Sequence, residues 1–393
     1  MTTLADMKQT YDIVLFGATS FVGRLTADYL AQHHSDLRIA IAGRNWAKLQ
    51  NLRLPFTPLR ADAANKQELD QLARSAKVII STVGPYTRYG DYLVDACAES
   101  GTHYVDLCGE ALFIRRIIDR WHGKTDSKIV HSCGFDSVPS DMGMFNLWLK
   151  SGRSTFREVV MAVDKLQGGL SGGTIDSMRE VSQDAKRMPK GGAILHSPYS
   201  LSPDHTREPD LGAQPDLVAE YVPLLKQWAG PFFMAMFNTR VVRRSNALSD
   251  YRYGDQLRYR EVTPTGEGVG GQLKAKALLG AIGAGFATIM TEPLRKPLSR
   301  IIPEPGEGPK NIDEGGFVIT HHGVTTDGRY VSGRVSAEGD PGYKVTAMML
   351  AEAAVTLATA PQGLPAATGV LTPATGLGEP YLAALKRNGM AFG

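Results

Sequence analysis

Short apolar runs alternate with segments of helical spacing over the first 140 residues of the chain. The apolar runs have the length of strands and cover residues 13–16, 38–42, 59–61, 78–81, 103–107 and 128–131. Amphipathic segments of about ten residues separate most of them, which is the length of a short helix. This alternation predicts an α/β fold of the Rossmann type, in which helices cover both faces of a doubly wound parallel sheet.

The pattern changes near residue 140. A long strand is expected over residues 156–166, and residues 189–231 are rich in Pro, Gly, Ser and Asp and predict loops. Two further strands, 316–323 and 329–338, are joined through Thr326-Asp327-Gly328, which is a good hairpin signal. These features predict an inserted α+β domain that contains an antiparallel sheet.

An Ala-rich segment over residues 344–358 predicts a late helix, and a short helix is expected over 380–386. We therefore divide the chain into a dinucleotide-binding Rossmann domain, 1–140, and a substrate and oligomerisation domain, 141–343. Residues 344–393 are expected to return to the first domain and complete it.

The sequence DIVLFGATSFVG at residues 12–23 predicts a strand, a tight turn and the start of a helix. In doubly wound folds this unit binds the pyrophosphate of a dinucleotide, because the free N–H groups of the helix start face the negative charge. Gly17 permits the turn, and Gly23 lets the helix pack close to the strand. A glycine-rich turn without a ligand is the alternative. The predicted cofactor-binding residues are Gly17, Ala18, Thr19, Ser20, Phe21, Val22 and Gly23.

Arg44 follows the second strand, at the position that faces the adenosine ribose. A carboxylate there would accept hydrogen bonds from a free 2′-hydroxyl, whereas a guanidinium suits a 2′-phosphate. With the neighbouring Asn45, and with Arg24 and Lys48 expected to add to the positive field, Arg44 favours NADP(H) over NAD(H). A solvated charge at the end of a strand is the alternative reading of Arg44.

Three loops after later strands bring polar groups to the same edge of the sheet. Val83, Gly84 and Pro85 are expected over the cofactor, and Tyr86 either stacks on the nicotinamide, donates a proton or is simply exposed on a Gly-Pro turn. The other two loops lie near residues 106–110 and 131–141. Within the second of them, Asp136 is a better functional candidate than Ser140 or Asp141. Asp106 and Glu110 are expected at the same edge of the sheet. The residues with structural alternatives are Glu110 and Asp141, as first-turn acids, Ser137 and Ser140, as helix caps, and Cys108, as a buried thiol.

Composition narrows the class of protein. The chain has 393 residues, 43% hydrophobic and 21% charged, as in folded globular proteins. A net charge of +3 and the lack of a basic tract with aromatics argue against nucleic acid, and no zinc-ligand spacing occurs. Three cysteines and no visible secretion signal predict a cytoplasmic, reducing compartment.

Residues 277–291, ALLGAIGAGFATIMT, carry no charge and lie between cationic residues. The segment is too short for a comfortable membrane span. Burial or self-association is expected first, and peripheral contact with a membrane second. A homodimer is expected by default.

Several motifs together resemble a known family. GATSFVGR, AGRN, STVGPY, HYVDLCGE and HSCGFDSVPSD occur in this order, followed by SGGTIDS, PEPGEGP, GDPGY and GVLTPATGLG. They are similar to the saccharopine dehydrogenase-like oxidoreductases, in the branch with the trans-acting enoyl reductases of bacterial lipid synthesis. The resemblance implies an NADP-binding Rossmann domain and an inserted substrate domain. By their positions, the residues that match the family's cofactor-binding motifs are Gly17, Thr19, Ser20, Gly23, Arg44 and Gly84.

The function expected from this resemblance is NADPH-dependent reduction of an enoyl or similar group on an apolar, carrier-bound or lipid substrate. Tyr86 is the first candidate for the proton donor and Asp136 the second. The backbone of Gly172, Gly173 and Thr174 is expected to hold the substrate oxygen. A saccharopine-type amino-acid or imine oxidoreductase is one alternative, and a non-catalytic cofactor-binding protein on a lipid surface or partner is the other.

Overall fold

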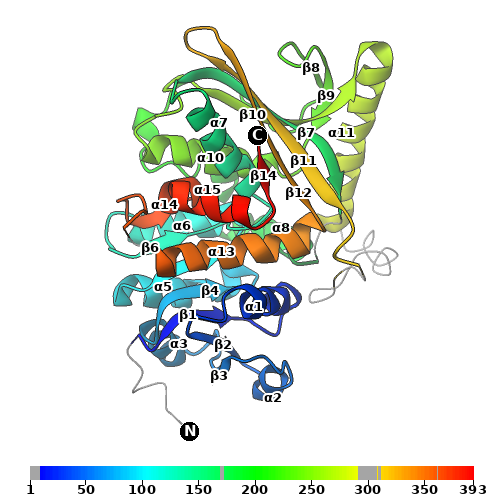
Figure 1. Cartoon of the computed structure of the whole chain (residues 1–393). Coiled ribbons are helices and arrows are strands. Elements are labelled where there is room, and N and C mark those ends of the chain that lie inside the picture. The colour runs from blue at the N-terminus through cyan, green and yellow to red at the C-terminus, as the bar shows by residue number, and fades with distance from the viewer. Residues whose placement is uncertain (1–8, 169–171, 291–307, 309–310, 361) are drawn as a thin grey trace.

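Two seven-stranded sheets, one in each half of the molecule, organise the chain in the computed structural model (Figure 1). The structure describes residues 9–168, 172–290, 308, 311–360 and 362–393. The N-terminal half forms the lower part of Figure 1 and the inserted half the upper part, with the late helices between them.

Every strand pair of the first sheet is parallel, in the order β13-β6-β5-β4-β1-β2-β3. This confirms the predicted Rossmann-type sheet. The order places β1 and β4 at the centre, where the direction of winding reverses and ligands bind. The strands are β1 (Tyr11–Phe16), β2 (Ile39–Gly43), β3 (Thr57–Arg60), β4 (Ala76–Ser81), β5 (His103–Asp106), β6 (Lys128–Val130) and β13 (Gly369–Leu371).

Alternate side chains of β1 enter two separate cores, because successive residues of a strand point to opposite faces. Ile13 and Leu15 belong to one hydrophobic cluster, and Val14 and Phe16 belong to the other. Both faces are therefore covered, as the continuous apolar runs predict. The connecting helices are α1 (Phe21–His33), α2 (Trp46–Gln50), α3 (Lys66–Arg74), α4 (Tyr86–Tyr89), α5 (Asp91–Ser100) and α6 (Ala111–Trp121).

The second sheet confirms the predicted inserted α+β domain and is antiparallel except for one pair, which makes it mixed. Its order is β14-β12-β11-β7-β10-β9-β8, and β7 and β10 pair in parallel while its other pairs are antiparallel. The chain between β7 and β10 is long enough for the crossover that parallel pairing requires. The strands are β7 (Phe156–Gln167), β8 (Glu220–Val222), β9 (Gln227–Pro231), β10 (Arg258–Gly266), β11 (Gly316–Thr325), β12 (Tyr330–Glu338) and β14 (Ala391–Phe392).

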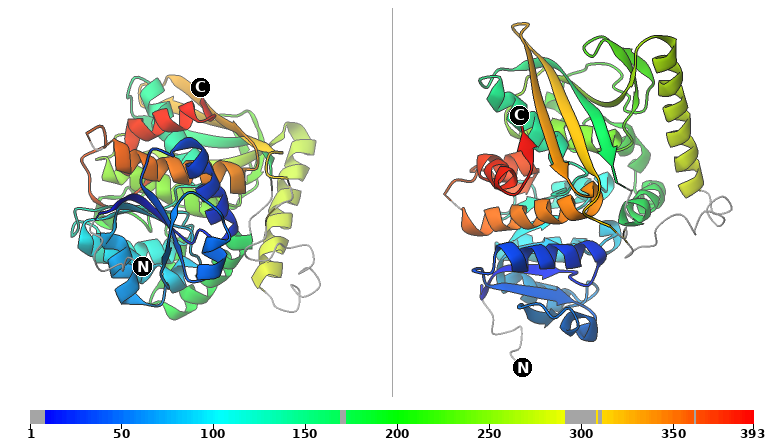
Figure 2. Two further views of the ribbon diagram at one scale, coloured as in Figure 1. Left: turned by 60° about the horizontal axis from the view of Figure 1, so that its bottom comes forward. Right: turned by 45° about the vertical axis from the view of Figure 1, so that its right-hand side comes forward.

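Helices of the inserted half lie between its sheet and the first sheet, or stand beside the sheet (Figure 2). The region 189–231, predicted as loops, also contains a short α-helix, a 3-10 turn (His205–Arg207) and two strands, and the following helix α10 was not predicted at all. The expected hairpin between β11 and β12 is present. The helices are α7 (Val138–Lys150), α8 (Gly172–Arg187), α9 (Gly191–His196), α10 (Ala235–Leu248) and α11 (Gly268–Met290).

The C-terminal segment joins both halves. Helix α13 (Thr346–Thr359) packs against α1, β4 and β5, and β13 extends the first sheet beside β6. After α14 (Pro373–Gly376) and α15 (Gly378–Arg387), however, β14 pairs with β12 of the second sheet. The domain boundaries at 140 and 343 stay a prediction, and β14 lies outside the half to which that prediction assigned it.

The apolar segment 277–291 forms much of α11, apart from Thr291, which lies outside the described residues. It is not a buried helix: α11 packs on β9 and β10 along one side, and Ala277, Ala281 and Ala284 are exposed. Among the described residues, no helix has the length and apolarity to cross a membrane. Membrane contact and self-association stay predictions.

Candidate active site

The turn between β1 and α1 has the geometry of an anion-binding helix start. Gly17 adopts a φ of 95°, where glycine is favoured. Ser20 caps α1 by accepting a hydrogen bond from the N–H of Gly23 at 3.0 Å. Thr82, which follows β4, donates its hydroxyl to the Gly17 carbonyl at 3.0 Å and lies 3.1 Å from the Ser20 hydroxyl. The turn is thereby fixed to the centre of the sheet.

The residues of this turn fit a dinucleotide. A Cβ on Gly23 would lie 2.2 Å from the Gly17 carbonyl oxygen, and a Cβ on Gly17 would lie 2.6 Å from the Thr82 hydroxyl. Gly23 is therefore required for the close approach of two backbone segments, and Gly17 for the close approach of the Thr82 side chain. The free N–H groups at the start of α1 would hold the pyrophosphate of NADP(H). The assignment of the individual residues 17–23 to this cofactor stays a prediction.

Arg44 is exposed at the end of β2, and its guanidinium makes no hydrogen bond or ion pair with a described residue. Asn45, in contrast, uses its side chain to cap α2, accepting from the N–H of Lys48 at 3.0 Å. Arg60 pairs in register with Gly43 and adds a second exposed cation close by. Arg44 is therefore available for a 2′-phosphate, whereas the Asn45 side-chain oxygen is already engaged.

Replacing Arg44 with alanine is expected to weaken NADPH binding about 10- to 100-fold and to leave NADH binding unchanged. A hydrogen bond to a charged group contributes about 1.5–3 kcal/mol, and each 1.4 kcal/mol corresponds to a factor of about ten. Fluorescence titration of the two reduced cofactors measures the effect. Arg74→Ala, at an exposed site on the opposite edge of the sheet, is the matched control. An equal loss for both cofactors in Arg44→Ala would contradict the assignment.

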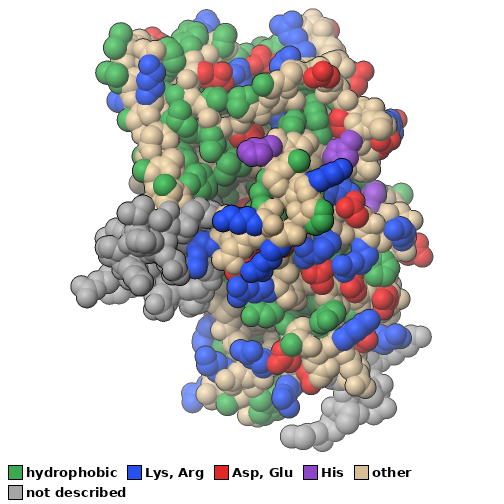
Figure 3. All heavy atoms as spheres, turned by 180° about the vertical axis from the view of Figure 1, so that it is seen from behind, with side chains coloured by type: hydrophobic (Ala, Val, Ile, Leu, Met, Phe, Trp, Pro, Cys, Tyr) green, Lys and Arg blue, Asp and Glu red, His purple; other side chains and the backbone are tan. Residues whose placement is uncertain are grey.

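A cavity of about 1220 Å³ extends from this turn into the inserted half. Ser20, Phe21 and Val22 line one end, together with the loop that contains Gly84 and Pro85. Figure 3 shows hydrophobic side chains gathered around a hollow on the face opposite to that of Figure 1. The apolar wall on the side of the inserted half is formed by Val181, Leu195, Phe233, Met234, Met236 and Phe237.

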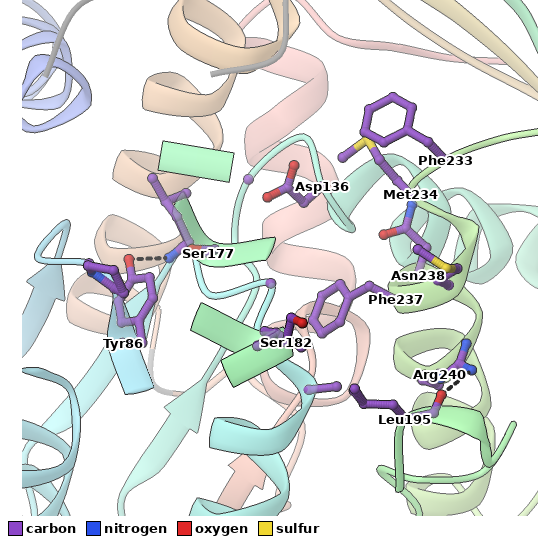
Figure 4. A pocket seen from close by; sticks show the side chains of 18 of the residues that line it. Tyr86, Asp136, Ser177, Ser182, Leu195, Phe233, Met234, Phe237, Asn238 and Arg240 are labelled. Carbon is purple, nitrogen blue, oxygen red and sulfur yellow. Dashed lines mark hydrogen bonds between the residues drawn. The ribbon is translucent and has the colours of Figure 1, made fainter. Parts of the chain in front are cut away.

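Asp136 lies in the cavity wall, between the Tyr86 loop on one side and the side chains of α10 on the other (Figure 4). It is half-buried, and its carboxylate makes no hydrogen bond or ion pair with a described residue. Burial raises the pKa of Asp136 to about 6, because the apolar surroundings disfavour the charged form. Asp136 is thus a carboxyl group able to hold and release a proton near neutral pH.

Tyr86 is buried, so it is not an exposed residue on a turn. Its hydroxyl donates to the Ser81 carbonyl at 3.0 Å and accepts from the N–H of Leu107 at 3.2 Å. Burial and the nearby Asp106 carboxylate raise the pKa of Tyr86 well above its ordinary value. The ring lines the cavity, but the hydroxyl joins β4 to the loop after β5. This geometry favours Asp136 over Tyr86 as the proton donor, the reverse of the order expected from the sequence.

The remaining acidic candidates near β5 have structural partners. Asp106 accepts hydrogen bonds from His131 Nδ1 at 2.7 Å and from two backbone N–H groups. Glu110 stands before α6, but its side chain does not cap that helix and instead contacts the loop after β4. Cys108 is a buried free thiol, as predicted. None of these side chains lies in the wall of the described cavity.

Capping by Ser137 or Ser140 is not observed. Ser137 precedes α7 without a side-chain cap, and its hydroxyl donates to Asn238 Oδ1 at 3.2 Å. Ser140 accepts from Asn238 Nδ2 at 3.2 Å. Asp141 lies in the first turn of α7 but accepts from Ser245 and from the N–H of Ala374 at 2.8 Å. These residues join α7 to α10 and to the C-terminal segment.

Sequence reasoning missed α10, which supplies much of the cavity wall. Asn238 on this helix lines the cavity and donates to Glu261 at 3.1 Å, and burial raises the pKa of Glu261 to about 7. The helix has no clear apolar periodicity in the sequence. Arg240, Arg243 and Arg244 are buried, but from the sequence alone charged residues are expected on an exposed face. The neighbouring Thr239, Val241 and Val242 have only moderate helix propensity and gave no further signal.

Gly172, Gly173 and Thr174 form the first residues of α8. Backbone N–H groups at the start of a helix lack partners within it. Their predicted role in holding the substrate oxygen stays a prediction.

Comparison with known proteins agrees with this geometry. The family described as saccharopine dehydrogenase NADP binding domain matches residues 13–125. A Mycobacterium tuberculosis protein assigned by name to the trans-acting enoyl reductases is 41% identical over 97% of this chain and 97% of its own length. The trans-acting enoyl reductase of Mycobacterium bovis is 37% identical, covering 99% of both chains.

The fold also resembles a solved structure. Apo histidine-tagged saccharopine dehydrogenase (L-Glu forming) from Saccharomyces cerevisiae aligns with a TM-score of 0.53, covering 98% of this chain and all of that chain at 12% identity. At this identity the likeness concerns the fold alone. NADP(H) is the cofactor that the matched domain binds, which confirms the preference inferred from Arg44.

Proposed function

Since the chain belongs to the trans-acting enoyl reductases of the saccharopine dehydrogenase-like oxidoreductases, we propose that it reduces the conjugated double bond of a carrier-bound enoyl thioester. Its class, an NADP(H)-dependent oxidoreductase of the enoyl reductase type, follows from the family. The carrier-bound state of the substrate is the proposed part, and it rests on the names of the relatives and on the size of the cavity.

The observation that carries the proposal is the position of Asp136. Its carboxyl group, which makes no hydrogen bond or ion pair with a described residue, lies in a largely apolar cavity that begins at the dinucleotide turn and continues past α10. A polar substrate such as an amino acid would need converging charges there. Lys186 and His196 also line the cavity, beside many apolar side chains. Arg240 and Asp216 do converge at the wall, but they bind each other at 2.7 Å, and Arg240 also donates to the Leu195 carbonyl. The arrangement favours an apolar acyl chain over a saccharopine-type substrate.

The chain's own residues provide the proton and the positioning. When bound, NADPH supplies the hydride that adds to the β-carbon of the enoyl group. Asp136, in its protonated form, donates its proton to the α-carbon and regains one from solvent, so the double bond gains a hydride and a proton. Phe233, Met234 and Phe237 exclude water from the acyl chain. The backbone N–H groups at the start of α8 are our candidates for stabilising charge on the thioester oxygen.

A direct assay tests the proposed activity. Purified protein with NADPH and trans-2-enoyl thioesters of pantetheine, from four to sixteen carbons, is expected to yield the saturated thioester in equal amount to the NADPH consumed. Mass spectrometry of the product and absorbance of NADPH measure both. Saccharopine, and lysine with 2-oxoglutarate, serve as comparison substrates. Turnover of these substrates, with none of any enoyl thioester, would overturn the proposal.

A further inference from the structure

Glu110 is a buried carboxylate that contacts both the loop after β4 and helix α8. It accepts hydrogen bonds from the N–H of Tyr86 at 2.9 Å, from the N–H of Thr87 at 2.7 Å and from the Thr87 hydroxyl at 2.6 Å. Its fourth donor is the Ser177 hydroxyl of α8, at 2.9 Å. Neutral groups thus satisfy the carboxylate completely, and no ion pair within the described part of the chain involves it.

The first of these segments is the end of the cofactor loop. Tyr86 and Thr87 directly follow Gly84 and Pro85, which line the cavity beside the dinucleotide turn. The second segment, α8, forms a wall of the same cavity through Ser177, Val181 and Ser182. Glu110 therefore lies between the part of the site that meets the cofactor and the part that meets the substrate.

Polar side chains of α8 contact the first half. No side chain of α8 that the structure describes belongs to a hydrophobic core cluster. Arg88 binds Glu180 through two nitrogens, at 2.7 and 3.0 Å, and Arg116 lies 3.5 Å from Asp184. Ser177, Glu180 and Asp184 fall on one stripe of the helix, at the spacing that places side chains on a common face.

Partly exposed ion pairs contribute little to stability, so the Arg88 and Arg116 pairs hold α8 weakly. The Ser177 contact differs, because its acceptor is fully buried and already fixed to the cofactor loop. Ordering of that loop by a cofactor is then transmitted through one carboxylate to the wall that faces the substrate. Coupling of this kind is reciprocal between the two ligands.

We propose that Glu110 is a positioning residue that couples the cofactor loop to α8, so that bound NADPH orders the substrate wall. The proposal rests on the proposed function for the nature of the substrate only. The coupling itself concerns the cofactor and this chain, and a measurement without substrate tests it.

Hydrogen exchange with and without NADPH measures the coupling. In the unaltered protein, NADPH is expected to slow amide exchange both in residues 84–90 and in residues 177–187. In Ser177→Ala, slowing is expected to persist at 84–90 and to be lost at 177–187, with the dissociation constant of NADPH changed less than about twofold. Ser177→Thr keeps a hydroxyl and is expected to restore the effect. Gln183→Ala, at an exposed site on the same helix, is the control.

Steady-state kinetics with an enoyl thioester tests the effect of the coupling on the substrate. Ser177→Ala is expected to raise the KM for an enoyl thioester about 5- to 10-fold with kcat lowered less. Glu110→Gln, which retains the shape but loses acceptor capacity, is expected to reduce protection of both segments. Equal NADPH-dependent protection of α8 in Ser177→Ala and in the unaltered protein would overturn the coupling. Absence of enoyl turnover with normal coupling in exchange would instead overturn the proposed function alone.

Discussion

Asp136→Asn is expected to lower the rate of enoyl reduction in a single turnover by about 10²- to 10⁴-fold, the range by which a positioned general acid accelerates a reaction. Asparagine keeps the size of the side chain and cannot deliver a proton. Since Asp136 contacts no other described side chain through a hydrogen bond, folding and NADPH binding should be unchanged. Stopped-flow decay of NADPH fluorescence with an enoyl thioester measures the rate.

The rate of reduction is also expected to decrease as the pH rises. Only the protonated form of Asp136 donates, and its pKa is raised to about 6. The rate of reduction in the unaltered protein should therefore be level below pH 6 and fall about tenfold per unit above it. Asp136→Asn should lack this dependence. A rate that stays constant between pH 5 and 8 in the unaltered protein, or an undiminished rate in the variant, would exclude Asp136 as the donor.

Gly23→Ala is expected to weaken the binding of NADPH and NADH alike, by about 10²- to 10⁴-fold. The added Cβ would lie 2.2 Å from the Gly17 carbonyl and 2.7 Å from the Ser20 hydroxyl, and a backbone atom cannot move aside cheaply. Displacing the turn from the start of α1 removes at least two hydrogen bonds to phosphate, each worth about 1.5–3 kcal/mol. Calorimetric titration with both cofactors measures the loss.

Gly270→Ala is the matched control, because a Cβ there has no atom within 4 Å. Thermal unfolding of both variants separates a local effect from misfolding. If Gly23→Ala binds NADPH as tightly as the control does, the turn before α1 is not the pyrophosphate site.

The cofactor half was predictable because its signals are local. The run of residues 12–23 defines a strand, a turn and a helix within a dozen positions, and Gly17 and Ser20 take the conformations that this motif requires. Alternating apolar runs then specify parallel strands whose carboxyl ends share one edge. Arg44 follows from the same reasoning, since its place after β2 is set by the order of the strands.

The substrate half was less predictable because its contacts join distant segments. Nothing near Glu110 in the sequence indicates that Ser177 is its partner, and capping was an equally reasonable role for Ser140. The Tyr86 hydroxyl is engaged by Leu107, which only the pairing of β4 with β5 reveals. Parallel pairing of β7 with β10 depends on a crossover whose helix carries buried arginines and gives no clear periodic pattern.

The placement of β13 and β14 also affects how the protein is made. One of these strands completes the lower sheet and the other extends the upper sheet, and each follows all other described strands of its sheet in the sequence. During synthesis each half therefore acquires this edge strand after its other strands. Until β13 and β14 pair, β6 and β12 each present an unpaired edge, the kind of surface on which nascent chains associate wrongly. Addition of the C-terminal segment is the event that covers both edges.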